Sequence, residues 1–323
     1  MPLNELLPIA GALTAPAFFL LFALAALGAP LLALVCLASG QLHSTQYIEA
    51  YSRRLLRMAF SSALPAVLAL LMVCGLLAFS GSWVRDWLQA APAVPALFSV
   101  AGLAFLGLLL KLRLTQSAAR RSRQASPMLQ AFTLSVLALA VLWLALALTH
   151  GLLTQAQAVV RAPLAEGLGV VPLISPDASD FPPLFWTALA ALVPLCTACA
   201  GTLSLEYLLL LRDREPFGRE ALTQMLRIAA RCTLRSALLA AAFLPVLWTH
   251  LPEQSTQPEG MLAAQVMLGL AAGFALLLCL SSGSLARSGR PWARPLAVHL
   301  TWLCAWLCLA SLLCVAMLCF YAA

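Results

Sequence analysis

Residues 9–38 read IAGALTAPAFFLLFALAALGAPLLALVCLA, a run of 30 residues without a charged side chain. A helix of about 20 mostly apolar residues is long enough to cross the hydrocarbon core of a bilayer. Seven further runs of this kind follow, at 59–80, 94–114, 128–150, 183–211, 232–250, 261–286 and 295–321. The sequence therefore predicts an all-α integral membrane protein with eight transmembrane helices.

The composition leaves little room for a soluble domain. Apolar residues make up 63% of the 323 residues and charged residues only 10%, whereas soluble proteins contain about 45–50% and about 25% of these classes. The net charge is +7, but the basic residues lie in short loops between apolar spans and form no patch on a soluble face. We therefore expect neither an extramembrane enzyme domain nor a nucleic-acid partner.

The basic residues gather at one end of the predicted bundle. Of the 19 lysines and arginines, 17 follow spans one, three, five and seven: Arg53, Arg54, Arg57, Lys111, Arg113, Arg120, Arg121, Arg123, Arg212, Arg214, Arg219, Arg227, Arg231, Arg235, Arg287, Arg290 and Arg294. The opposite loops contain only Arg85 and Arg161. Since positive loops stay on the cytoplasmic side, we predict a multi-pass protein of the bacterial cytoplasmic (inner) membrane with both termini on the outer, periplasmic side.

A weak internal repeat divides the spans into two groups of four. The segment YSRRLLRMA at 51–59 leads into span two, and QMLRIAAR at 224–231 leads into span six. Each is a basic amphipathic stretch. We predict a first four-helix bundle at 1–155, an outer-side connecting loop at 156–182 and a second four-helix bundle at 183–323. A pseudo-twofold axis along the membrane normal would relate the two bundles.

Few ionisable residues fall within the spans, where such groups are costly and often functional. Glu206 near the end of span five is a candidate proton relay or quinol contact, or else a carboxylate that pairs with a loop arginine. His150 and His250 each follow a threonine and end an outward-running span. If spans four and six are neighbours, these two imidazoles could ligate a b-type haem or accept a quinol proton. His299 lies a turn inside span eight near Arg294, and the sequence shows no partner for it.

These three residues, Glu206, His150 and His250, are our candidates for binding a cofactor. We predict no catalytic residue and no metal ligand. The ten cysteines lie in or beside apolar spans, where small residues usually mark close helix packing. We expect them to pack between helices.

Several short motifs stand at the ends of spans. They are Tyr51-Ser-Arg53-Arg54, Phe181-Pro-Pro-Leu-Phe-Trp186, Tyr207 followed by Arg212-Asp213, Ala229-Ala-Arg231, and Pro245-Val-Leu-Trp248-Thr-His-Leu-Pro252. Together they resemble subunit I of the cytochrome bd quinol oxidase superfamily. The resemblance implies paired four-helix bundles and quinol oxidation near the outer face. It also implies haem iron held by a His in span one, two Glu in span three, a His at the start of span five and a Met further on.

The haem ligands that the resemblance implies are missing. Residues 8–40 contain no histidine, Ala101 and a residue near Leu109 replace the two glutamates, and the span-five histidine would fall near Trp186 and Thr187. Haem iron would have no protein ligands here. We therefore expect no b-type haem and no oxygen reduction by this chain.

We interpret the chain as a haem-free, bd-oxidase-like subunit of a respiratory, quinol-linked electron-transfer complex. It would be non-catalytic, with a structural, accessory or quinone-binding role, and quinone is the cofactor to consider. Its expected partners are the lipid bilayer and other membrane subunits of a redox complex, a cytochrome among them. Two alternatives stay open: the quinone-binding membrane anchor of a molybdoenzyme or polysulfide-reductase type complex, and a small-molecule transporter.

Overall fold

The computed structural model describes residues 3–43, 46–79, 93–118, 127–161, 183–212, 218–249 and 258–322. Within these ranges the chain is almost wholly helical and contains no strand. The helices are α1 (Leu3–His43), α2 (Gln46–Phe79), α4 (Ala93–Ala118), α5 (Pro127–Arg161), α6 (Pro183–Leu211), α7 (Arg219–Ala241), α8 (Leu244–Thr249), α9 (Pro258–Arg287), the short 3₁₀ helix η3 (Pro291–Ala293) and α10 (Pro295–Ala322). Eight helices in the described ranges are long and apolar enough to cross a membrane, which confirms the predicted all-α membrane fold.

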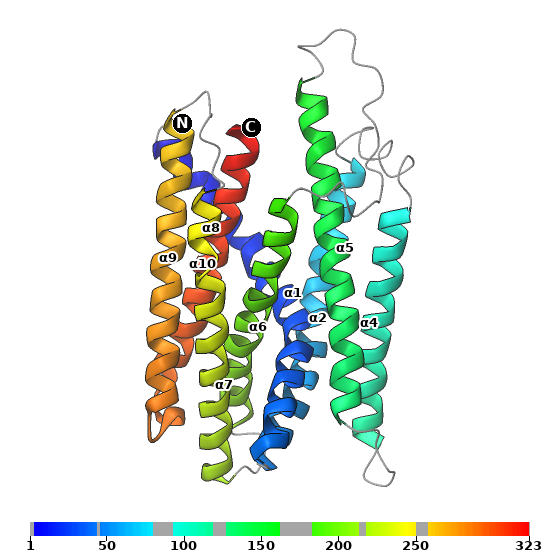
Figure 1. Cartoon of the computed structure of the whole chain (residues 1–323), viewed down its shortest axis with the longest axis vertical. Coiled ribbons are helices and arrows are strands. Elements are labelled where there is room, and N and C mark those ends of the chain that lie inside the picture. Colours follow the sequence, from blue (N-terminus) through cyan, green and yellow to red (C-terminus); the bar gives the residue numbers. More distant parts are fainter. Residues whose placement is uncertain are drawn as a thin grey trace.

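The helices pack in the same order in both halves of the chain. In the first half, α1 and α4 each contact α2 and α5. In the second half, α6 and α9 each contact α7 and α10. The halves meet through α1 and α6, and α1 also contacts α10 while α5 contacts α6. In Figure 1 the long helices stand side by side, with α1 and α6 between the outer helices of the two halves.

The central contact between α1 and α6 depends on small residues. Ala17, Leu21, Ala25, Ala29 and Ala33 recur every four residues on α1 and are all buried, so they form a buried stripe along this helix. On a neighbouring face, a Cβ atom added at Gly28 would overlap the backbone carbonyl of Cys196 on α6. The two backbones therefore touch, as is common where small residues line helix contacts in membranes.

The side-chain contacts that join the halves include a pair of hydroxyls and a pair of thiols. The hydroxyl of Tyr51 on α2 lies 2.8 Å from the hydroxyl of Ser204 on α6, and both residues are buried. The sulfur atoms of Cys36 on α1 and Cys232 on α7 lie 3.6 Å apart. The cysteines that the structure describes are free thiols within the helix packing.

The helices extend beyond the apolar runs from which they were predicted. Helix α5 continues to Arg161, so residues 156–161 are helical although they were assigned to the connecting loop. Helix α7 begins at Arg219, well before the predicted start of span six at residue 232. Hydropathy marks the part of a helix within hydrocarbon, whereas the backbone hydrogen bonds continue into the polar interface. Span six is also interrupted at Ala242 and Phe243, just before Pro245, which lacks the N–H that a continuous helix would need.

The two ends of the bundle differ in charge. Helix α1 begins and α10 ends at the top of Figure 1. We call the opposite end the basic end; there α1 ends, α2 begins, α6 ends, α7 begins, α9 ends and α10 begins. The described arginines of those helix ends include Arg53, Arg57, Arg219 and Arg290. The start of α1 and the end of α10 thus share the end of the molecule opposite the basic end.

Candidate functional site

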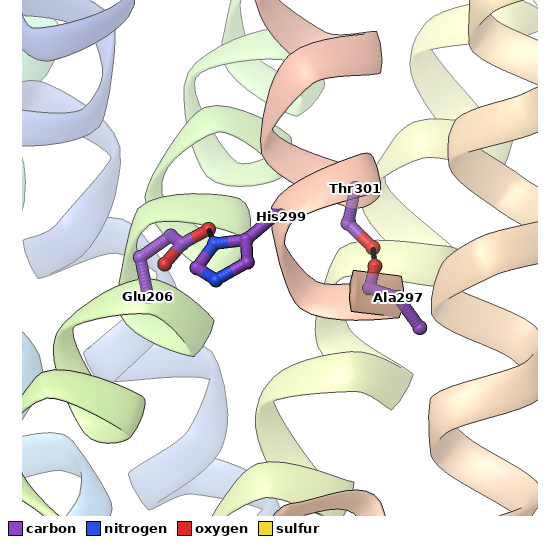
Figure 2. Close-up of polar contacts among 4 residues, drawn as sticks. All are labelled: Glu206, Ala297, His299 and Thr301. Carbon is purple, nitrogen blue, oxygen red and sulfur yellow. Dashed lines mark hydrogen bonds and ion pairs between the residues drawn. The ribbon is translucent and has the colours of Figure 1, made fainter. Parts of the chain in front are cut away.

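Two titratable side chains meet near the basic end. Nδ1 of His299 on α10 lies 2.8 Å from Oε1 of Glu206 on α6, and Figure 2 shows the two side chains pointing toward each other. The Glu206 side chain is 17% exposed and that of His299 is 59% exposed. The pair therefore links two helices while one of its members faces the outer surface of the bundle.

The antiparallel packing of α6 and α10 places this pair at one depth. Glu206 lies five residues before the end of α6, and His299 lies four residues after the start of α10. At a rise of about 1.5 Å per residue, both lie roughly 6–8 Å from the end of their helix. The opposite face of α10 packs against α9 through Thr301, which is fully buried. Its hydroxyl lies 2.7 Å from the carbonyl oxygen of Ala297 and 3.1 Å from the hydroxyl of Ser281 on α9. Figure 2 shows Thr301 pointing away from His299.

A hollow of about 410 Å³ lies beside the pair, and we call it the Glu206 groove. It is lined by Phe22 of α1, Met58, Ser61 and Ser62 of α2, Leu203, Glu206, Tyr207 and Leu210 of α6, and His299 and Trp302 of α10. Most of this lining is apolar, with a few polar groups. Sites for small organic molecules commonly combine an apolar wall with a few polar groups that orient the ligand.

The pair can exchange a proton with a ligand. When Glu206 is an ionised carboxylate it only accepts hydrogen bonds, and His299 Nδ1 is then the donor in the 2.8 Å contact. In the neutral imidazole the other ring nitrogen, Nε2, is then an acceptor. If Nε2 takes up a proton, the resulting imidazolium keeps its hydrogen bond to the carboxylate. The arrangement therefore suits a ligand that gains or loses protons.

The structure gives Glu206 a different partner from the one favoured by its sequence position. A loop arginine is the simplest partner for a carboxylate at that point of span five, yet the hydrogen bond is to His299. His299, for which the sequence shows no partner, is therefore the residue that sequence reasoning missed. The sequence does contain a signal for this pair, namely that both residues lie at a similar depth, about one turn inside the same end of the bundle.

Of the two other candidate residues, His150 does not line this groove, and His250 cannot be placed from the described residues. His150 lies on α5 in the first half and is half-buried. His250 lies outside the described residues, just after α8. Figure 1 shows α5 and α8 on opposite sides of α6. A joint site for these two histidines stays a prediction, because only His150 belongs to the described residues.

The positions at which the resemblance implies histidine and glutamate ligands in spans three and five carry no iron-binding group. On α4, Leu109 is buried in the core and Ala101 packs against it. Trp186, at the start of α6, is exposed. Within the described ranges no group of three or more His, Cys, Asp or Glu side chains could hold a metal ion. These residues do not fit a haem.

Comparison with known proteins does not assign this chain to a family. The chain matches no model of a protein family and no curated protein.

Proposed function

We propose that this chain is a haem-free membrane subunit of a quinol-linked electron-transfer complex and that the Glu206 groove binds the headgroup of a quinone. The observation that carries the proposal is the carboxylate–imidazole pair, joined at 2.8 Å, in the wall of a mainly apolar groove. A quinone headgroup is a flat apolar ring with two oxygens that become hydroxyls on reduction. It requires an apolar slot together with a group that exchanges protons.

Access from the bilayer supports this choice of ligand. His299 is 59% exposed and Leu210, at the edge of the groove, is 70% exposed. Both lie on helices that are long and apolar enough to cross the membrane, so their exposed surfaces would face lipid. Quinones dissolve in the bilayer and would reach the groove from the side. Trp302, which also lines the groove, offers an aromatic surface for the ring.

The proposed site differs in depth from the one that the resemblance implies. In the bd superfamily quinol oxidation is expected near the outer face, whereas the Glu206 groove lies toward the basic end. We propose that this end faces the cytoplasm of a bacterial inner membrane, because positive loops are retained there. The quinone would then bind in the inner leaflet. Since the haem ligands of the bd superfamily are missing, a redox-active partner subunit would supply or accept the electrons.

Quinone titration tests the proposal. The full chain would be reconstituted in lipid nanodiscs, and a short-chain ubiquinone or naphthoquinone added while the tryptophan fluorescence is followed, since Trp302 lines the groove. We expect saturable quenching. Loss of a hydrogen bond to a charged group costs about 1.5–3 kcal/mol, so Glu206→Gln and His299→Phe should each weaken binding about tenfold or more.

The matched control is Glu49→Gln. This substitution also replaces a carboxylate near the basic end, but Glu49 pairs with Arg53 on the exposed surface of α2 and does not line the groove. Its quinone affinity should stay at the wild-type value. Equal quenching in wild type and both groove variants would contradict the proposed site. An absorption spectrum of the purified chain with reduced b-type haem bands would contradict its haem-free character.

A further inference from the structure

A second hollow, of about 480 Å³, lies between α7 and α9 at the basic end. We call it the arginine hollow. It is lined by Arg227, Arg231, Leu234, Arg235, Gly283, Ala286 and Arg287. It shares no residue with the Glu206 groove.

The four arginines converge from two antiparallel helices. Arg227, Arg231 and Arg235 follow one another at four-residue intervals, so they lie on one face of α7. Nε of Arg227 donates a hydrogen bond of 2.9 Å to the backbone oxygen of Ser288, directly after the end of α9. Arg231 and Arg235 lie about 6 Å and about 12 Å further along α7. The hollow thus runs from the end of α9 into the membrane-spanning part of α7.

The positive charge in this hollow has no acidic counterpart among the described residues. Among the described residues, none of the four guanidinium groups forms an ion pair, whereas Arg53 on α2 pairs with Glu49. Charged side chains within a span are costly and are usually paired. Several guanidinium groups around one cavity favour an anion with multiple oxygen atoms, which can accept their hydrogen bonds.

Membrane topology alone does not explain the shape of this site. Basic residues that only orient a protein need to lie near the cytoplasmic boundary, without converging on a cavity. Here the arginines surround free space, because a Cβ atom added at Gly283 would meet only Cδ2 of Leu234, at 3.9 Å. The cavity has room for a ligand that the arginines can contact.

The surface next to the hollow matches a lipid better than a soluble anion. Leu239 continues the arginine face of α7 by one more turn, and Leu280 lies one turn from Gly283 on α9; each is 61% exposed. The same surface therefore offers guanidinium groups near the basic end and apolar side chains deeper in the membrane. Basic pockets between transmembrane helices on the cytoplasmic side are known to suit anionic headgroups.

We propose that the arginine hollow binds the phosphate headgroup of an anionic phospholipid, whose acyl chains lie along Leu239 and Leu280. The phosphate oxygens accept hydrogen bonds from Arg231, Arg235 and Arg287. Arg227 keeps its hydrogen bond to the backbone oxygen of Ser288, and its positive charge attracts the phosphate.

Native mass spectrometry of the full chain in mild detergent tests this site. The delipidated protein would be titrated with phosphatidylglycerol, with phosphatidylcholine, which has no net charge, and with inorganic phosphate. We expect phosphatidylglycerol to bind about tenfold or more tightly than phosphatidylcholine. Inorganic phosphate should not displace it. Displacement by inorganic phosphate would overturn the lipid assignment in favour of a soluble anion.

Two variants separate the charge of the hollow from its volume. Arg231→Gln/Arg235→Gln removes two guanidinium groups, and Gly283→Leu fills the cavity while it keeps all four arginines. Each should weaken phosphatidylglycerol binding about tenfold or more. The control Arg290→Gln/Arg294→Gln removes the same charge at the same end from residues outside the hollow, and its affinity should stay within about twofold of wild type.

Equal weakening in the control would show diffuse electrostatic attraction and overturn the site. If Gly283→Leu binds phosphatidylglycerol with wild-type affinity, the proposed site is overturned as well. If the double arginine variant fails to fold, as judged by circular dichroism and gel filtration, the Gly283→Leu variant decides alone.

Discussion

Tyr51 illustrates how a recognisable motif residue can serve the fold. It belongs to the segment that resembles the bd superfamily, and its side chain is fully buried. The Ser204 hydroxyl donates to the backbone oxygen of Gly201, at 2.6 Å, so the 2.8 Å contact requires the Tyr51 hydroxyl to donate to Ser204. Because the two residues belong to different halves, this hydrogen bond contributes to their association.

The direction of this hydrogen bond predicts that substitutions of its two partners lower the stability of the protein by unequal amounts. Ser204→Ala leaves the buried Tyr51 hydroxyl without its acceptor, whereas Tyr51→Phe removes the donor and leaves Ser204 bonded to Gly201. Hydrogen bonds between membrane helices are worth about 0.6 kcal/mol on average, and an unsatisfied buried group costs about 1–3 kcal/mol. We therefore expect Ser204→Ala to lower the free energy of unfolding more than Tyr51→Phe does.

Thermal or SDS-induced unfolding in detergent measures this difference. The double variant Tyr51→Phe/Ser204→Ala should be more stable than Ser204→Ala alone, because neither hydroxyl is then left in the interface. Additive losses in the double variant would contradict the hydrogen bond.

At the level of helices, Gly28 sets the distance between α1 and α6. Since a Cβ atom there would overlap the carbonyl of Cys196, Gly28→Ala must push the two backbones apart. Overpacking of this kind costs about 1–3 kcal/mol. The matched control is Gly107→Ala on α4, where a Cβ atom would meet nothing within 4 Å. We expect a lower unfolding midpoint for Gly28→Ala and no loss for Gly107→Ala in the same detergent. Equal midpoints would show that α1 and α6 are less closely packed than described.

Hydropathy predicts the helices of this chain well because each span must be both apolar and long. It does not predict their ends, since α7 keeps its backbone hydrogen bonds from Arg219 onward, although Arg227 and Arg231 are polar. It also does not predict which helices are neighbours. Glu206 could be singled out as an ionisable residue in a span, but its link to His299 depends on the contact between α6 and α10, which lie far apart in the sequence.

The whole molecule depends on an interface between two halves that share one order of helix contacts. Both proposed sites depend on this arrangement in different ways: the Glu206 groove includes residues of α1 and α2 as well as α6 and α10, whereas the arginine hollow lies within the second half. A chain cut between residues 161 and 183 tests the interface directly. If helix packing between the halves suffices for association, the two pieces should copurify when they are coexpressed.

The sulfur atoms of Cys36 and Cys232, 3.6 Å apart on opposite sides of this interface, provide a covalent readout for the cut chain. A disulfide requires the sulfurs to approach to about 2.05 Å, which small side-chain rotations could achieve. Copper-catalysed oxidation should therefore join the two pieces into a band of full-length size on a non-reducing gel. Cys36→Ser should abolish this band. Cys279→Ser should leave it unchanged, because Cys279 is a free cysteine on α9 outside this contact. A crosslink that persists in Cys36→Ser would come from a different pair of cysteines, and would contradict its assignment to the contact between Cys36 and Cys232.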